Sequence, residues 1–223
     1  MALPGREPCA PRPRAAAVGR PAADPACAGC AQLGTLRALR RAGLAVQGGL
    51  GCEPATAGEI VPVPGRWAAV TGAARLLARG AGALRAETEG ARLLVIADRL
   101  PADRAGPIER ALARAGARVW RIDPADLAGA ERAAARAAET EGAALVALAP
   151  CTRGERRGLP LAVDPARCNR CGACLGLACP AVSDPGGEAM AIDAATCSGC
   201  GLCAALCRGR AIGAREPAAA ATG

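Results

Sequence analysis

CNRCGACLGLACP, at residues 168–180, contains four cysteines in a short stretch, and a related run, CSGCGLCAALC, follows at residues 197–207. An apolar stretch and an acidic residue precede each run, as LAVD at 161–164 and MAID at 190–193. Another apolar pair comes after each run. We therefore interpret residues 160–213 as an internal duplication that forms one small α+β domain.

The spacing within each run is that of a metal-binding loop. A 4Fe-4S cluster needs four converging thiolates, and Cys-x2-Cys-x2-Cys lets one tight loop supply three of them. The pattern resembles that of bacterial two-cluster ferredoxins, in which the fourth cysteine of each run binds the cluster of the other half. This resemblance implies two 4Fe-4S clusters, one on Cys168, Cys171, Cys174 and Cys207 and the other on Cys197, Cys200, Cys203 and Cys179.

The chain departs from the ferredoxin pattern in two details. Arg208 stands where a proline follows the fourth cysteine, and four residues separate Cys174 from Cys179 where the pattern has three. A zinc ribbon is one alternative, but it uses only two Cys-x2-Cys pairs for its ion. A disulfide framework is the other, and an odd total of 13 cysteines argues against it. We therefore predict one-electron transfer as the chemistry of this domain.

Composition excludes several classes of protein. The chain has 223 residues, 52% of them hydrophobic, with no phenylalanine or tyrosine, so its core must consist mainly of small and aliphatic side chains. The net charge is +8, but the arginines are scattered and not interleaved with aromatic residues, so we expect no nucleic-acid binding. No apolar run approaches the roughly 20 residues of a membrane helix. The start has no apolar signal core either, so we expect a cytoplasmic protein without a membrane span.

Apolar strands and helices alternate in the residues before the cysteine runs. The predicted strands are ARLLVIAD at 91–98, ARVWRID at 117–123 and ALVALAP at 144–150, and the predicted helices between them are 107–115 and 126–141. Such alternation is typical of right-handed crossovers and a parallel sheet. The fold class that we predict is therefore α/β, with a doubly wound parallel sheet ahead of the small duplicated domain.

The region upstream of these strands has a weaker pattern. Leu33, Leu36 and Leu39 lie at helical spacing, and Gly43 ends this predicted helix before a brief strand at 44–46. We predict a glycine-interrupted helix at 67–86. The chain thus divides into a flexible arm at 1–26, an α/β domain at 27–152, the ferredoxin-type domain at 160–213 and a flexible tail at 214–223.

Most of the chain also resembles one family of enzymes. The sequence IERALARAGARVWRIDPADLAGAERAAARAAETEGAALVALAPC, at 108–151, leads into LAVDPARCNRCGACLGLACPAV and looks like the end of the indolepyruvate ferredoxin oxidoreductase alpha subunit. In that family a thiamine-pyrophosphate-binding domain precedes a two-cluster ferredoxin domain. CAGC at 27–30 and GGLGC at 48–52 resemble the opening of that thiamine domain. The resemblance covers about residues 27–213.

The thiamine site of that family is incomplete in this chain. The family holds Mg²⁺ on the coenzyme through a Gly-Asp-Gly/Ser strand end and a downstream asparagine, which are oxygen ligands suited to that ion. Here the comparable strand ends in VIADRLP, so Asp98 is the candidate residue and has no such asparagine. Gln32 replaces the family's histidine, and Gly49 replaces an aspartate. We also expect the domain that covers the coenzyme's pyrimidine ring to be missing, so the isolated chain should bind neither thiamine pyrophosphate nor Mg²⁺.

Related 2-oxoacid:ferredoxin oxidoreductases carry a further cluster near the thiamine. The resemblance implies a third 4Fe-4S cluster here on Cys27, Cys30, Cys52 and Cys151. The alternative is that these cysteines are buried small hydrophobic residues. Both interpretations remain open at this point, and Cys9 has no assigned role.

Three functions follow from these patterns. The first is an electron-transfer protein that carries two or three clusters and docks on a redox partner, either a ferredoxin or an oxidoreductase subunit. The second is a subunit of a thiamine-dependent 2-oxoacid (aryl-pyruvate):ferredoxin oxidoreductase, completed by another chain that supplies the magnesium site. The third is a scaffold whose clusters serve folding, because metal binding and folding are coupled.

Overall fold

The computed structural model describes residues 26–50 and 65–214 of the chain. They belong to two compact units. The sheet unit is Ala31–Cys151, and the cysteine unit joins the segment that ends at Cys30 to the chain from Thr152 onward. The predicted arm and tail lie outside the described residues, apart from Ala26 and Ala214. Within the described ranges, no helix is long and apolar enough to cross a membrane.

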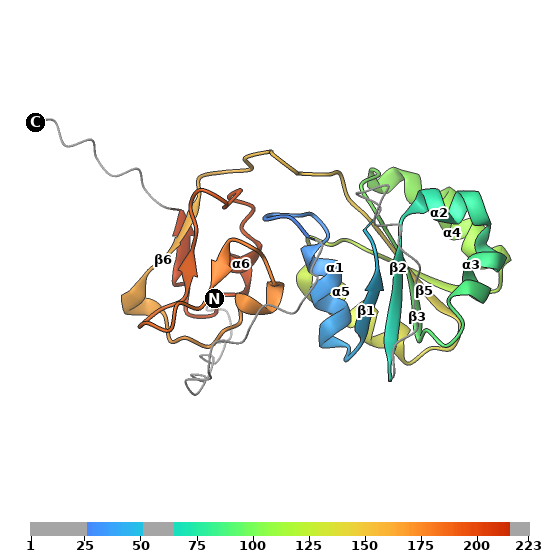
Figure 1. Ribbon diagram of the computed structural model, residues 1–223, viewed down its shortest axis with the longest axis horizontal. Coiled ribbons are helices and arrows are strands. Elements are labelled where there is room, and N and C mark those ends of the chain that lie inside the picture. Colours follow the sequence, from blue (N-terminus) through green and yellow to red (C-terminus); the bar gives the residue numbers. More distant parts are fainter. Residues whose placement is uncertain (1–25, 51–64, 215–223) are drawn as a thin grey trace, which may run out of the picture. The chain divides into compact units, whose positions relative to one another are not determined.

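The sheet unit contains five parallel strands in the order β1-β2-β3-β5-β4 (Figure 1). The strands are β1 (Ala45–Gly48), β2 (Trp67–Thr71), β3 (Leu93–Asp98), β4 (Arg118–Ile122) and β5 (Ala143–Leu148). Every residue of β2, β3 and β5 is buried. Continuous burial is expected of central parallel strands that are covered on both faces. The predicted α/β class with a parallel sheet is confirmed, and the arrangement is compatible with a doubly wound fold.

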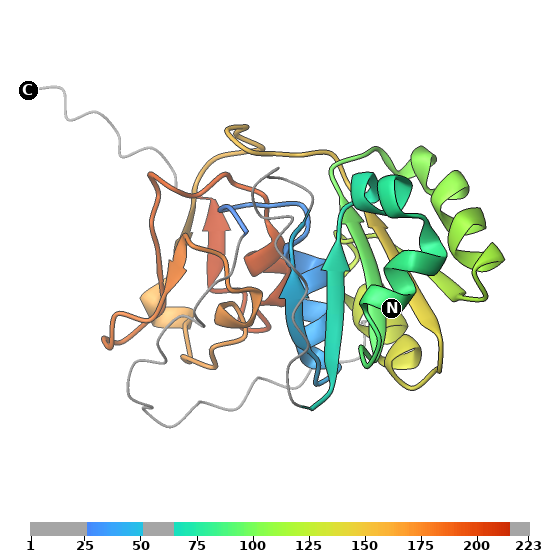
Figure 2. The same ribbon diagram turned by 45° about the vertical axis from the view of Figure 1, so that its right-hand side comes forward.

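Helices lie against both faces of this sheet (Figures 1 and 2). They are α1 (Leu33–Arg41), α2 (Ala73–Arg79), α3 (Ala81–Glu87), α4 (Ala105–Arg114) and α5 (Leu127–Ala138), with a short 3-10 turn at Ala102–Arg104. Helices α2, α3 and α4 share one apolar core with alternate residues of the strands, among them Trp67, Ile96 and Val146. Helices α1 and α5 pack against each other on the other face.

The predicted helix at 67–86 is wrong over its first part. Residues Trp67–Thr71 form strand β2, and the helical remainder is divided into α2 and α3 at Gly80, whose φ is +76°. Trp67 is 2% exposed and belongs to the core between the sheet and helices α2 to α4. Alanines 68 and 69 favour a helix when considered alone, but burial on both faces of a sheet overrides that propensity here.

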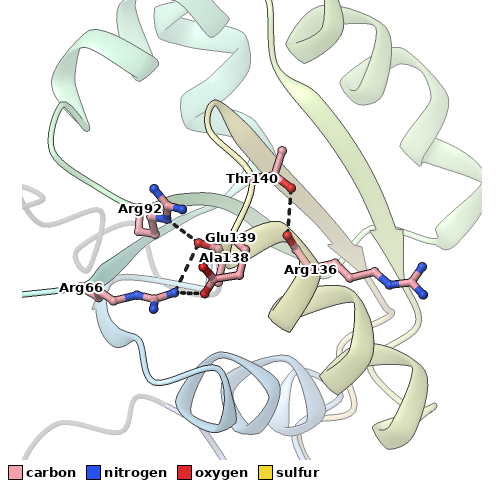
Figure 3. Close-up of polar contacts among 6 residues, drawn as sticks. All are labelled: Arg66, Arg92, Arg136, Ala138, Glu139 and Thr140. Carbon is pink, nitrogen blue, oxygen red and sulfur yellow. Dashed lines mark hydrogen bonds and ion pairs between the residues drawn. The ribbon is translucent and has the colours of Figure 1, made fainter.

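Two arginines cap the carboxyl end of α5 (Figure 3). Arg66 donates to the carbonyl of Ala138 at 3.3 Å and pairs with the Glu139 carboxylate at 2.6 Å. Arg92 Nε donates to the same carbonyl. The last carbonyls of a helix have no partner within the helix and carry partial negative charge, so cationic donors stabilise this end. These two arginines therefore act within the fold of the sheet unit.

Four short strands build the cysteine unit and join its two halves. They are β6 (Leu161–Val163), β7 (Val182–Ser183), β8 (Ala191–Ile192) and β9 (Ile212–Ala214), with helix α6 (Leu202–Leu206) and 3-10 turns at Pro165–Arg167 and Leu175–Leu177. Strand β6 pairs with β9 and β7 with β8, both antiparallel. Each pair takes one strand from each half of the duplication.

The acidic residue of each half repeats the same contacts. Asp164 N donates to the carbonyl of Ala211 at 2.7 Å, and Asp193 N donates to that of Ala181 at 2.9 Å. Each bond links one half to the other. Each aspartate also accepts, through Oδ1, the amide two residues further on at 3.0 Å. Both turns that lead into the cysteine runs are therefore fixed in the same way.

Candidate metal centre

The two cysteine loops have matching backbone conformations. In the first loop Arg170 and Gly172 have φ of 56° and 71°, and in the second the corresponding Gly199 and Gly201 have φ of 74° and 80°. Alternation with left-handed residues turns successive backbone N–H groups toward the inside of a loop and makes it concave. Such a loop suits an anionic group at its centre. Only Arg170 departs from glycine at these four positions, and it pairs with Asp184 at 2.8 Å.

One set of four cysteines lines a common cavity. Its wall includes Cys168, Cys171, Cys174 and Cys207, together with Val163, Met190 and Ile212. The space between these walls is partly open to solvent. Three of the thiols come from the first run, and Cys207 comes from the end of the second. Ala211 N donates to Cys207 Sγ at 3.2 Å, so the backbone holds this fourth thiol.

The other four cysteines also lie together. Burial raises the pKa of Cys179, and charge on Cys200 and Cys197 raises it further. This cysteine of the first run packs in the same apolar cluster as Cys197 and Cys203 of the second. Burial raises the pKa of Cys203 to about 12, with added contributions from Cys200, Cys179 and Cys197. The amides of Leu161 and Gly199 each donate to Cys197 Sγ at 3.5 Å. Among the described residues, the first predicted set thus lines one cavity, and Cys179, Cys197 and Cys203 of the second lie in one apolar cluster.

The two sets adjoin each other. Charge on Cys174, in the first set, contributes to the raised pKa of Cys203, in the second. Burial likewise raises the pKa of Cys174 to about 11. These buried thiols are therefore neutral near pH 7 in the metal-free chain, and any metal that binds them has to displace their protons.

The thiols of both sets and the backbone amides near them are the groups that an iron–sulfur cluster would contact. None of these eight described cysteines forms a disulfide, and they present soft sulfur atoms with backbone amides directed at several of them. Among the described residues, no group of three or more cysteine, aspartate or glutamate side chains is arranged to hold a metal ion. A four-iron cluster is larger than one ion and holds its thiolates farther apart, so a cavity between four cysteines suits it better than a single ion.

The hydroxyl of Ser198 is a further group that suits an anionic cluster. Its Oγ atom is buried, and in the part of the chain that the structure describes it has no hydrogen-bond partner. A buried hydroxyl without a partner is costly. Because Ser198 follows Cys197 directly, this hydroxyl is available to donate to a sulfur-rich anion bound by the second set. The residues present therefore fit the group.

Asp98 lies at the carboxyl end of β3, where the sequence predicts it, but both oxygens of its carboxylate already accept hydrogen bonds from backbone amides. Oδ2 accepts from Ala73 N at 2.6 Å, at the start of α2, and Oδ1 accepts from Arg99 N at 2.7 Å. Gln32, at the position of the family's histidine, is buried and donates to the carbonyls of Asp98 and Ala147 at 3.0 and 2.9 Å. Both side chains thus hold the end of the sheet together.

The cysteines of the predicted third set are divided between regions. Cys27 and Cys30 belong to the cysteine unit and Cys151 ends the sheet unit, while Cys52 lies outside the described residues. The third cluster therefore stays a prediction. Cys27 and Cys151 are exposed, so the alternative interpretation as buried hydrophobic residues is wrong for these two.

Sequence reasoning missed that CAGC contacts the second cysteine loop. Gly29 lies against Ser198 and Cys200. Ala28 packs against the apolar cluster that includes Cys197 and Cys203. The only signal was that CAGC and CSGC share a Cys-x2-Cys spacing, which does not predict their contact. Comparisons of this chain with protein-family models, with curated proteins and with solved structures find no match.

Proposed function

We propose that this chain is an iron–sulfur electron-transfer protein that carries two 4Fe-4S clusters. Cys168, Cys171, Cys174 and Cys207 would hold one cluster, and Cys197, Cys200, Cys203 and Cys179 the other. The observation that carries the proposal is that four cysteines drawn from both runs line one cavity. When bound, such clusters accept and release single electrons over a wide range of potentials.

The roles of the protein follow from the contacts around the thiols. The left-handed positions of both loops and the amides of Leu161, Gly199 and Ala211 direct N–H groups toward sulfur. Such donors stabilise the negative charge of a cluster and help to set its potential. Cys174 and Cys203 lie in adjoining sets, which favours passage of an electron from one cluster to the other. A ferredoxin or an oxidoreductase subunit is the kind of partner that this chemistry needs.

Anaerobic purification followed by measurement of iron and acid-labile sulfide tests the proposal. Two clusters correspond to about eight irons and about eight sulfides per chain. Reduction should produce an EPR signal that disappears on reoxidation. About one or two zinc ions with no acid-labile sulfide would overturn the proposal in favour of a zinc site. Iron that is bound but cannot be reversibly reduced would instead favour a role in folding.

A second candidate function is a subunit of a thiamine-dependent 2-oxoacid:ferredoxin oxidoreductase. The resemblance and the parallel sheet that ends at Asp98 support it. Because both carboxylate oxygens of Asp98 accept backbone amides, another chain would have to supply the magnesium site. Titration of the isolated chain with thiamine pyrophosphate and Mg²⁺ by calorimetry should then give no heat of binding. Saturable binding would show that this chain holds the coenzyme by itself.

A further inference from the structure

The segment that ends at Cys30 lies over the second cysteine loop of its own unit. Cys30 N donates to the carbonyl of Cys27 at 3.0 Å, which closes a turn around Gly29. Thr152 Oγ1 donates to the carbonyl of Gly29 at 2.9 Å and anchors the turn from the other side. Ala28 packs against the core that contains Cys197 and Cys203. Figure 2 shows this first described part of the chain in blue.

Gly29 makes the closest approach in this contact. A Cβ atom at this position would lie 1.9 Å from Ser198 Oγ and 2.8 Å from Ser198 Cβ. The φ of Gly29 is +69°, which side chains of L residues disfavour. Only glycine allows the turn to lie so close to the loop.

The linker from Thr152 covers the same loop from a second direction. Arg157 N donates to the carbonyl of Ser198 at 2.8 Å. A Cβ atom on Gly199 would lie 2.5 Å from the carbonyl oxygen of Gly158, so this contact is also tight. The cavity of the first cysteine set, in contrast, opens to solvent. The two sets therefore differ in how they are covered.

We propose that residues 26–30 form a cover that packs against the second cysteine loop and protects the cluster of the second set from solvent. The inference rests on the proposed function. It makes the two clusters unequal, with the first exposed for exchange of electrons with a partner and the second an internal carrier. It also gives the CAGC segment a role that does not require a third cluster.

The experiment measures release of iron to a chelator from proteins with one cluster each. Cys168→Ala with Cys207→Ala leaves only the covered set complete, and Cys179→Ala with Cys197→Ala leaves only the open set complete. Gly29→Ala is then added to each background. In the covered background, iron release should become about five- to thirtyfold faster, the factor that corresponds to the cost of a side chain in the left-handed region. In the open background, the rate should not change.

Two further variants keep the test decisive if Gly29→Ala disturbs folding. Ser198→Gly removes the atoms that a new Cβ meets first and leaves Cys200 Cβ as the nearest, at 3.8 Å. Gly29→Ala should therefore accelerate release less in a Ser198→Gly background than alone, with each rate compared with that of its own parent because Ser198→Gly also removes a hydroxyl beside the second set. Gly186→Ala is the matched control, because Gly186 has φ of +79° and a Cβ atom added there would meet nothing within 4 Å. Equal acceleration in both backgrounds, or none in either, would overturn the inference. Wild-type protein without iron would instead overturn the proposed function.

Discussion

Two double variants distinguish crossed from uncrossed binding of the clusters. In the first variant Cys168 and Cys207 are both changed to alanine, and in the second Cys197 and Cys207 are changed. Each protein loses two of its eight candidate ligands, so the two are matched in the number of thiols removed. They differ only in whether the lost thiols belong to one set or to two.

The expected amounts of iron follow from the cavity. Cys168 and Cys207 line the same cavity, so their joint loss damages one set and leaves the other with four thiols. The first variant should therefore keep about four of about eight irons per chain. The second variant removes one ligand from each set, and no complete set of four remains. Its content of 4Fe-4S cluster should fall close to zero.

The assay is iron and acid-labile sulfide per chain after anaerobic purification, with EPR of the reduced protein to identify four-iron clusters. Cys9→Ala, at a cysteine with no assigned role, serves as the control and should keep the full iron content. The opposite ranking, with more four-iron cluster in the Cys197/Cys207 variant, would mean that each run binds its own fourth cysteine. That result would refute the assignment made from the cavity.

Three predictions concern the sheet unit and are measured by chemical unfolding. Gly34→Ala should lower the free energy of unfolding by about 1–3 kcal/mol, because its Cβ would lie 1.8 Å from a carbonyl oxygen of the β4–α5 loop. Gly82→Ala, in a helix with nothing within 4 Å, should be neutral or stabilising by up to about 1 kcal/mol, and equal losses at both glycines would contradict this. Asp98→Asn should cost about 1–3 kcal/mol because one backbone amide loses its acceptor, and an unchanged stability would contradict that contact. Arg121 lowers the pKa of Glu109, so Glu109→Gln should be less stable than wild type at pH 7. The difference should vanish as the pH falls through that lowered pKa, below the usual 4.5, and a difference that persists in acid would refute the pairing.

The sequence predicts the sheet where its strands are rich in leucine, valine and isoleucine. Leu93–Asp98 is apolar up to its last residue and Ala143–Leu148 is apolar throughout; both are too short for helices, and both become central strands. Trp67–Thr71 is not recognisable as a strand by the same criterion, because two of its five residues are alanine, the strongest helix former. In a chain whose core is built from alanine, local propensity separates strand from helix poorly. Contacts across the sheet then decide the outcome.

The candidate site likewise depends partly on local spacing, which the sequence predicts, and partly on contacts between residues far apart in the sequence, which it does not. Spacing within Cys168–Cys174 is enough to predict a concave loop, because three thiols and a glycine lie within one turn of chain. The joining of Cys207 to that loop depends on the pairing of β6 with β9, which no local pattern contains. The contact of Gly29 with Ser198 is more distant still, and the sequence on either side of each residue gives no indication of it.

Reciprocal pairing between the halves makes each half of the cysteine unit depend on the other. Strands β6 and β9 join the start of the first half to the end of the second, and Asp164 and Asp193 repeat this exchange through their amides. Neither half alone brings four of its thiols to one cavity, so binding of the proposed clusters would be coupled to folding of this unit. On the proposed function, a role in folding would accompany electron transfer, and reversible reduction of the iron is what separates the two from a role in folding alone. What favours an electron carrier over a scaffold is that Cys174 and Cys203, one from each proposed set, lie in the same apolar cluster. A scaffold has no need for two clusters close enough to exchange an electron.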